Sequence, residues 1–199
     1  MKIRYLSHAC FEIKNKKTIL IDPYFSDNPL APKYEGKPDL IFVTHEHFDH
    51  SDVASFDLRV VCPIGFNCKN PVTMKIGDIK IIDDIKAQMV SASHHQSKYA
   101  TGYVIEFEDK RIYHPGDTYL DGIKSLGKID VFFVPIGGHY TMNSEEAVEA
   151  LQIIKPDLAI PMHFNTFPQI KANPEEFKIN AEKLGYKVRV MEIGEEIEI

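Results

Sequence analysis

A cluster of side chains that can bind metal lies in the first quarter of the chain. Within residues 44–50, three histidines and an aspartate occur together, at His45, His47, Asp49 and His50. Imidazoles this close would repel one another when protonated, and packing alone does not require three of them in one turn. A bound cation removes that repulsion, since neutral imidazole and carboxylate are both good metal ligands. The cluster therefore predicts a metal site.

Three further polar segments follow predicted strands and can complete this site. They are Ser93-His94-His95, the run from His114 to Thr118, and the run from Pro161 to Asn165. Functional loops gather at the carboxyl ends of strands, so these segments can meet the histidine cluster at one sheet edge. The local cluster supplies at most four ligands, whereas two metal ions need more. Taken together, the four segments favour a two-metal site.

The elements that must position these residues are mainly strands. Residues 40–43 form an apolar run, typical of a strand buried on both faces, which leads directly into the cluster. A Pro-rich loop, 22–38, precedes it. The other predicted strands are 2–6, 10–14, 18–21, 59–62, 72–76, 79–82, 86–91, 101–107, 111–114, 131–134, 158–160 and 187–193.

Two helices are predicted in the second half of the chain. One spans 144–155 with Ser144 as its N-cap, and the other spans 175–184, between Pro174 and Gly185. Strands followed by alternating helices and strands predict a single α/β domain over residues 1–199, with two packed sheets and helices outside.

Composition restricts the classes of function. The formal net charge is −6 and the basic residues are scattered, which disfavours a nucleic-acid partner. No apolar stretch approaches the ~18 residues of a membrane span, and the N-terminus does not resemble a secretory signal, so we expect a cytoplasmic protein without a membrane partner. The three cysteines lack a CxxC spacing and are expected to be free thiols. The partner we expect is a small-molecule substrate, with a homo-oligomer left open.

The order of the motifs resembles the metallo-β-lactamase superfamily over the whole chain. The pattern is His-x-His-x-Asp-His at 45–50, then a histidine, then Gly-Asp-Thr at 116–118, then the late His163. Segments 7–11, 21–23, 113–118, 140–142 and 161–168 look most similar to a small family of metal-dependent hydrolases of unassigned substrate. The resemblance implies a four-layer αβ/βα sandwich of two mixed β-sheets, with the site at the edge between the sheets.

The resemblance also implies how two divalent ions share the ligands. One ion would be bound by His45, His47 and His94, and the other by Asp49, His50 and His163, with Asp117 bridging them. His94 is preferred to His95 because segment 90–94 aligns better with the family's third motif. Asp22 resembles an acid that supports the metal-binding loop without binding the metal. The imidazole-rich pattern suits zinc, with manganese, iron or nickel as alternatives.

Hydrolysis is the activity that the resemblance implies. A hydroxide bound by both metals would attack a phosphodiester, a lactone or another ester in a small, anionic substrate. Asp49 would orient the hydroxide, and His8 and His139 are candidates for the leaving-group side. The pair Gly137-Gly138 would offer amides to an anion.

Two other hypotheses compete with a hydrolase. A di-iron redox protein on the same scaffold is one, although the flavodiiron relatives carry an acid where this chain has His47. A non-catalytic metal-binding protein is the other, and the intact ligand set argues against it. No Gly-x-Ser-x-Gly motif, P-loop or dinucleotide fingerprint occurs, which argues against a serine hydrolase or a nucleotide-binding enzyme.

Overall fold

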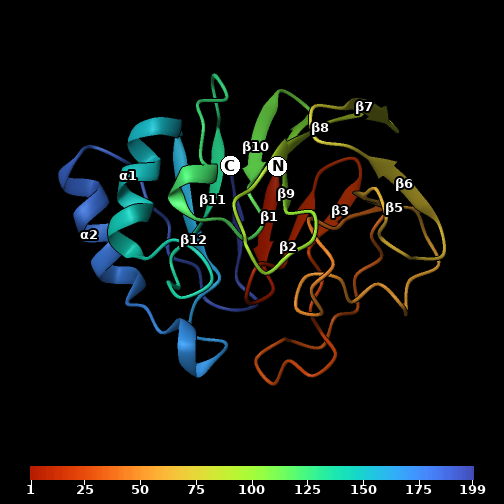
Figure 1. Cartoon of the computed structure of the whole chain (residues 1–199), viewed down its shortest axis with the longest axis horizontal. Coiled ribbons are helices and arrows are strands. Elements are labelled where there is room, and N and C mark those ends of the chain that lie inside the picture. The colour runs from red at the N-terminus through yellow and green to blue at the C-terminus, as the bar shows by residue number, and fades with distance from the viewer.

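Two mixed β-sheets packed face to face form the centre of the computed structural model, which describes all 199 residues (Figure 1). In spatial order the first sheet contains β13 (Glu196–Glu198), β1 (Lys2–Tyr5), β2 (Phe11–Lys14), β3 (Thr18–Ile21), β4 (Leu40–Phe42), β5 (Val60–Pro63) and β6 (Pro71–Met74). The second contains β12 (Leu158–Met162), β11 (Val131–Pro135), β10 (Lys110–His114), β9 (Thr101–Phe107), β8 (Ile85–Ser91) and β7 (Ile79–Ile82).

The strand β11 contributes side chains to two hydrophobic cores, one on each face of the second sheet. All five of its residues are buried. Because side chains alternate across a strand, Val131 and Phe133 enter the core between the sheets, whereas Phe132 and Val134 face the other way. There they pack under α1 (Ser144–Ile154) and α2 (Pro174–Lys183), which cover the outer face of the second sheet (Figure 1).

The outer face of the first sheet is covered by loops. Phe25 and Tyr34 from the long loop after β3, and Phe56 from the loop after β4, pack on its buried residues. The predicted α/β sandwich of two mixed sheets is therefore confirmed, with its α-helical layer on one side. Two short 3-10 helices complete the elements, η1 (Leu120–Gly122) and η2 (Pro168–Ile170).

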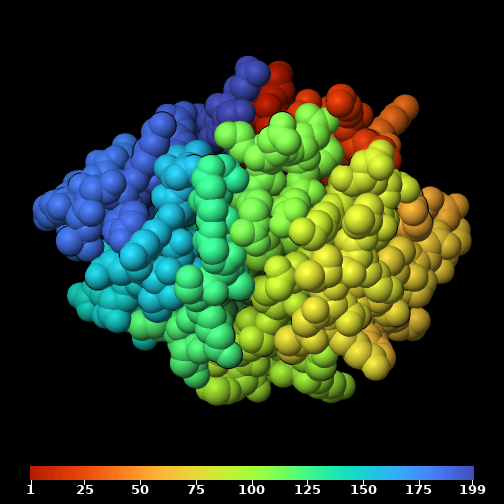
Figure 2. Space-filling model, turned by 90° about the horizontal axis from the view of Figure 1, so that it is seen from above, coloured from red at the N-terminus to blue at the C-terminus, as the bar shows by residue number.

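Two local predictions were wrong. Residues 187–193 do not form a strand, because only Val188 pairs with β12 before the chain crosses to the first sheet. There β13 pairs antiparallel with β1, which brings the first and last residues together (Figures 1 and 2). The first helix is capped by Asn143 rather than Ser144, since Asn143 and Glu146 form a reciprocal capping box.

Strand direction places the functional loops at one edge. In the second sheet β10, β11 and β12 are parallel, and β8 shares their direction through two antiparallel pairings. In the first sheet β1, β3 and β4 likewise run the same way. No helix has the length and apolarity to cross a membrane.

Candidate metal centre

Every predicted metal ligand, and His8 with them, lies in a loop or turn that follows a strand. In the first sheet, His8 lies in the turn after β1 and the cluster at 45–50 follows β4. In the second sheet, His94, Asp117 and His163 follow β8, β10 and β12. The loops of the two sheets meet, since the backbone N–H of His163 donates to the carbonyl oxygen of His8 at 2.8 Å.

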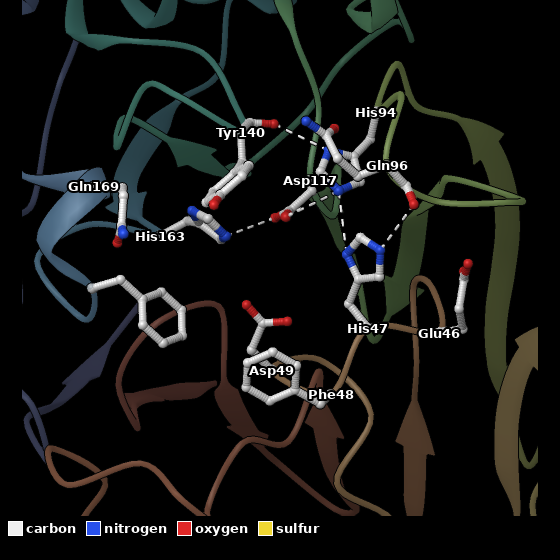
Figure 3. Close-up of a pocket in the computed structure, with 11 residues that line it drawn as sticks. Glu46, His47, Phe48, Asp49, His94, Gln96, Asp117, Tyr140, His163 and Gln169 are labelled. Carbon is white, nitrogen blue, oxygen red and sulfur yellow. Dashed lines mark hydrogen bonds and ion pairs between the residues drawn. The ribbon is translucent and has the colours of Figure 1, made fainter.

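The Asp117 carboxylate lies at the centre of the cluster (Figure 3). Its Oδ1 atom is 3.2 Å from His50 Nε2 and 3.1 Å from His163 Nε2. Its Oδ2 atom is 3.9 Å from His45 Nε2 and 3.7 Å from His94 Nε2. The two oxygens therefore face two different sets of histidines.

One of these sets, which we call the first group, consists of His45, His47, His94 and Asp117. Their potential ligand atoms all lie within 4.8 Å of one another. His47 Nδ1 is 3.1 Å from His45 Nε2 and 3.3 Å from His94 Nε2. Such spacings place all four donors around a single point.

The other set, the second group, consists of Asp49, His50 and His163 together with His8. His8 is fully buried, and its Nε2 atom lies 3.2 Å from Asp49 Oδ2. Its Nδ1 atom contacts the hydroxyl oxygen of Thr166. Burial, with a smaller contribution from His163, lowers the pKa of His8 to about 3, so the ring is neutral at pH 7.

The two groups differ in what supports their imidazoles. In the first group, the ring nitrogen of each histidine that faces away from the other ligands contacts an uncharged oxygen at 3.0 to 3.2 Å. The oxygens are the Thr44 hydroxyl for His45, the Tyr140 carbonyl for His94 and the Gln96 carbonyl for His47. In the second group, His50 Nδ1 lies 2.7 Å from the Oδ2 atom of Asp22, a buried carboxylate. Asp22 itself accepts hydrogen bonds from the backbone N–H and the hydroxyl of Thr44. A carboxylate in this position orients a metal-bound imidazole and makes it a stronger donor.

Several buried atoms directed into the cluster have no hydrogen-bond partner, namely His8 Nε2, His50 Nε2, Asp117 Oδ1 and His163 Nε2. The other ring nitrogen of His163 is also unpartnered. Buried polar atoms are seldom unpartnered, and a bound ion is one standard explanation. Positive charge is also favoured here: burial lowers the pKa of His50, but Asp117 and Asp22 outweigh burial and hold it well above its usual value. The donor set therefore fits divalent cations.

Backbone strain accompanies this geometry. His8, Asp22 and His163 all adopt left-handed backbone conformations, with φ of 58°, 45° and 56°. Such conformations are costly for these residue types and persist where the surroundings enforce them, often at functional sites. Gly137 permits the close approach, because a Cβ atom there would collide with the carbonyl oxygen of His163.

A pocket of about 470 Å³ opens over both groups (Figure 3). This volume falls within the range of small-molecule sites. Its lining residues are Glu46, His47, Phe48, Asp49, His94, Gln96, Asp117, Tyr140, His163, Phe167 and Gln169.

The structure separates the remaining predicted site residues. His94 enters the cluster, whereas the neighbouring His95 is exposed and lies against the ring of Tyr119. His139 is exposed and does not line the pocket, and the N–H of Gly138 is already used by the Met142 carbonyl oxygen, so it is not free to bind an anion.

Neither residue suggested for the leaving-group side lines the pocket, since His8 lies buried beneath Asp49. Tyr140 and Phe167 do line it. Both fall in segments that resemble the family, which was the only sequence signal for them. Gln96 and Gln169 carried no such signal.

Comparisons with known proteins identify the family of the chain. Residues 2–163 match the beta-lactamase superfamily domain. The chain is 40% identical over 222 residues to a UPF0173 metal-dependent hydrolase of Thermoplasma volcanium, with 100% of this chain and 99% of that protein covered. A UPF0173 metal-dependent hydrolase of Pyrococcus furiosus is 39% identical over 227 residues, with both chains fully covered. The structure of Igni18, a metallo hydrolase of Ignicoccus hospitalis, superposes with a TM-score of 0.87 at 33% identity, covering 98% of this chain and 97% of Igni18. The chain therefore belongs to the metallo-β-lactamase superfamily and is a metal-dependent hydrolase of the UPF0173 family.

Proposed function

We propose that this hydrolase binds two divalent cations, zinc foremost, and cleaves an ester, lactone or phosphodiester bond in a small substrate. The observation that supports it most strongly is the placement of Asp117, whose two carboxylate oxygens face the two ligand groups separately. One ion would be held by His45, His47 and His94, and the other by Asp49, His50 and His163. Two such ions, when bound, acidify water and stabilise negative charge that develops on oxygen.

Asp49 is the residue best placed to orient the attacking water. It lines the pocket, and its side chain is only partly exposed. Burial raises the pKa of Asp49, but the contact of its Oδ2 atom with His8 Nε2 and the nearby His50 outweigh burial and hold it well below its usual value. The carboxylate is therefore ionised at neutral pH, and it can bind a cation through one oxygen while the other accepts a hydrogen bond from water.

His8 acts on the reaction through Asp49 rather than through the substrate. The imidazole is buried behind that carboxylate and is fixed on its other side by Thr166. A residue so placed keeps a reactive group within the narrow range of productive geometry. We assign His8 as a positioning residue for Asp49.

The proposal is tested by a substrate panel on protein whose metal content is measured at the same time. The panel contains bis(p-nitrophenyl) phosphate, a lactone and a thioester, and metals are quantified by mass spectrometry. We expect two ions per chain and turnover of one bond class that disappears on chelation and returns with zinc. Turnover that survives complete removal of the metals would contradict the proposal.

The exposed residue His95 supplies a matched control. It is adjacent to His94 in sequence but lies outside the cluster. His95→Ala should keep both ions and full turnover, whereas His94→Ala should not. Equal behaviour of the two variants would remove His94 from the proposed ligand set.

A further inference from the structure

We propose that the substrate carries no charged group outside the bond to be cleaved and has an aromatic group beside that bond. This inference rests on the proposed hydrolytic function and specifies its substrate class. It also departs from the sequence, which favoured a small anionic substrate.

The first observation is the charge of the pocket wall. None of the eleven lining residues is a lysine or an arginine, whereas three are acids, Glu46, Asp49 and Asp117. Glu46 is fixed in place by the Ser97 hydroxyl and the Lys98 N–H, each at 2.8 Å. In proteins, arginine, lysine or free backbone amides bind a phosphate or carboxylate group that takes no part in the reaction.

The cations do not replace those missing groups. The cations would lie at the base of the pocket beside Asp49 and Asp117, where their charge acts on the reacting bond. The remaining hydrogen-bonding side chains of the wall are uncharged, namely the amides of Gln96 and Gln169 and the hydroxyl of Tyr140. A second anionic group on the substrate would therefore have no cationic partner in the wall, where Glu46 adds a negative charge, and this disfavours charged metabolites.

The second observation is a set of aromatic rings at the mouth of the pocket. Phe48 lies between the ligands His47 and Asp49, and 65% of its surface is exposed. Single exposed apolar side chains are common, but this one lines a pocket together with Phe167 and Tyr140. The Phe48 ring is 6.3 Å from Phe167 and 5.7 Å from Tyr24, which is buried behind it.

Phe48 and Phe167 form a wall on one side of the cluster, and Tyr140 lies on the other side (Figure 3). Phe167 also lies 5.4 Å from His8, so the aromatic residues border the second group. In Figure 3, Phe48 and Tyr140 lie on opposite sides of Asp49 and His163, whereas Glu46 and Gln96 lie on the side of His47. A flat ring between Phe48 and Tyr140 would be held by edge and face contacts next to the second group.

The first experiment compares two esters on the metal-loaded full chain. 4-Nitrophenyl pentanoate and mono-4-nitrophenyl glutarate share a leaving group and an acyl chain length but differ by a remote carboxylate. We expect kcat/KM to be at least tenfold higher for the neutral ester. Equal rates, or a preference for the glutarate, would overturn the inference while leaving the hydrolase assignment intact.

Variants then test the aromatic wall. Phe48→Ala and Phe167→Ala should each raise KM for the neutral aryl ester about 10- to 100-fold, because the ring of the bound substrate would lose an apolar partner that shields it from water. Turnover of γ-butyrolactone, which has no ring to stack, should change much less, and two ions per chain should remain bound. Ile81→Ala is the matched control, because Ile81 is 75% exposed on β7 and does not line the pocket. Unchanged KM in both phenylalanine variants would refute the aromatic contact.

Binding separates this inference from the proposed function. Valeranilide and glutaranilic acid are amides that match the two esters, and calorimetry measures their affinity without any turnover. We expect the neutral anilide to bind at least tenfold more tightly and to lose this advantage in Phe48→Ala. If the esters are not hydrolysed but the neutral anilide still binds more tightly, the esterase activity alone is refuted. If the two anilides bind equally well, the substrate class is refuted.

Discussion

The two ligand groups share Asp117 but are built differently. In the first group the imidazoles are supported by uncharged oxygens of Thr44, Gln96 and Tyr140. In the second group the buried carboxylate of Asp22 supports His50. Because an anionic partner strengthens an imidazole ligand, we expect the second group to bind its ion more tightly. The comparison shows that residues outside the ligand set can make two similar sites unequal.

The largest effect is expected from Asp117→Asn, which removes the feature that the groups share. One carboxylate charge between two cations is lost, so both ions should bind weakly and turnover should fall by about 10²- to 10³-fold or more. Metal content after gel filtration and kcat/KM report the two effects. Retention of two ions at wild-type affinity would show that the groups are independent of Asp117.

Removing a ligand from one group should separate the two groups. His94→Ala takes away a buried imidazole of the first group without touching the second. We expect one ion per chain to remain and turnover to be lost, since both ions are required. Cobalt substitution followed by absorption spectroscopy identifies which site is filled. Loss of both ions would mean that the groups fold only as a unit.

A smaller change is expected from Asp22→Asn, which preserves shape and removes charge. Outer support of this kind typically contributes 10- to 100-fold in metal affinity. Chelator titration of the wild type should release the ions in two steps, the first-group ion before the second. In Asp22→Asn the two steps should merge, and two well-separated steps in the variant would contradict the role given to this carboxylate.

The last prediction concerns the stability of the metal-free protein at acid pH. The pKa of His8 is about 3 in the fold because of burial and then His163, whereas the unfolded imidazole titrates near pH 6.5. Between those values the unfolded state binds a proton at His8 that the folded state does not bind. The free energy of unfolding is therefore unaffected by protonation of His8 above pH 6.5 and falls as the pH drops below it. His8→Asn removes this pH dependence, and asparagine tolerates the left-handed backbone at this position.

Urea unfolding at several pH values in the presence of chelator measures this difference. Between pH 6.5 and 3, the free energy of unfolding of the wild type should fall by up to about 1.4 kcal/mol per pH unit more than that of His8→Asn. His95→Ala, whose imidazole is exposed, should follow the wild type. Parallel curves for the wild type and His8→Asn would show that His8 is not buried neutral.

Local sequence patterns predicted most of the elements because they depend on nearest neighbours. The apolar run before the cluster became β4, and the apolar run 131–134 became β11. The predicted strand at 187–193 failed for a non-local reason, since that segment crosses from one sheet to the other. Its alternation of apolar residues could not reveal which partner strand would be within reach.

The sequence by itself determined the chemistry: a cluster of imidazoles and carboxylates after a buried strand, and further ligands after other strands. Only the tertiary structure decided which groups meet. It places His94 rather than His95 in the cluster, sets His8 behind Asp49, leaves His139 outside, and brings Phe48, Phe167 and Tyr140 to the same pocket. The reason is physical, because spacing along the chain fixes the order and type of donors, whereas distances between loops of different strands depend on how two twisted sheets pack.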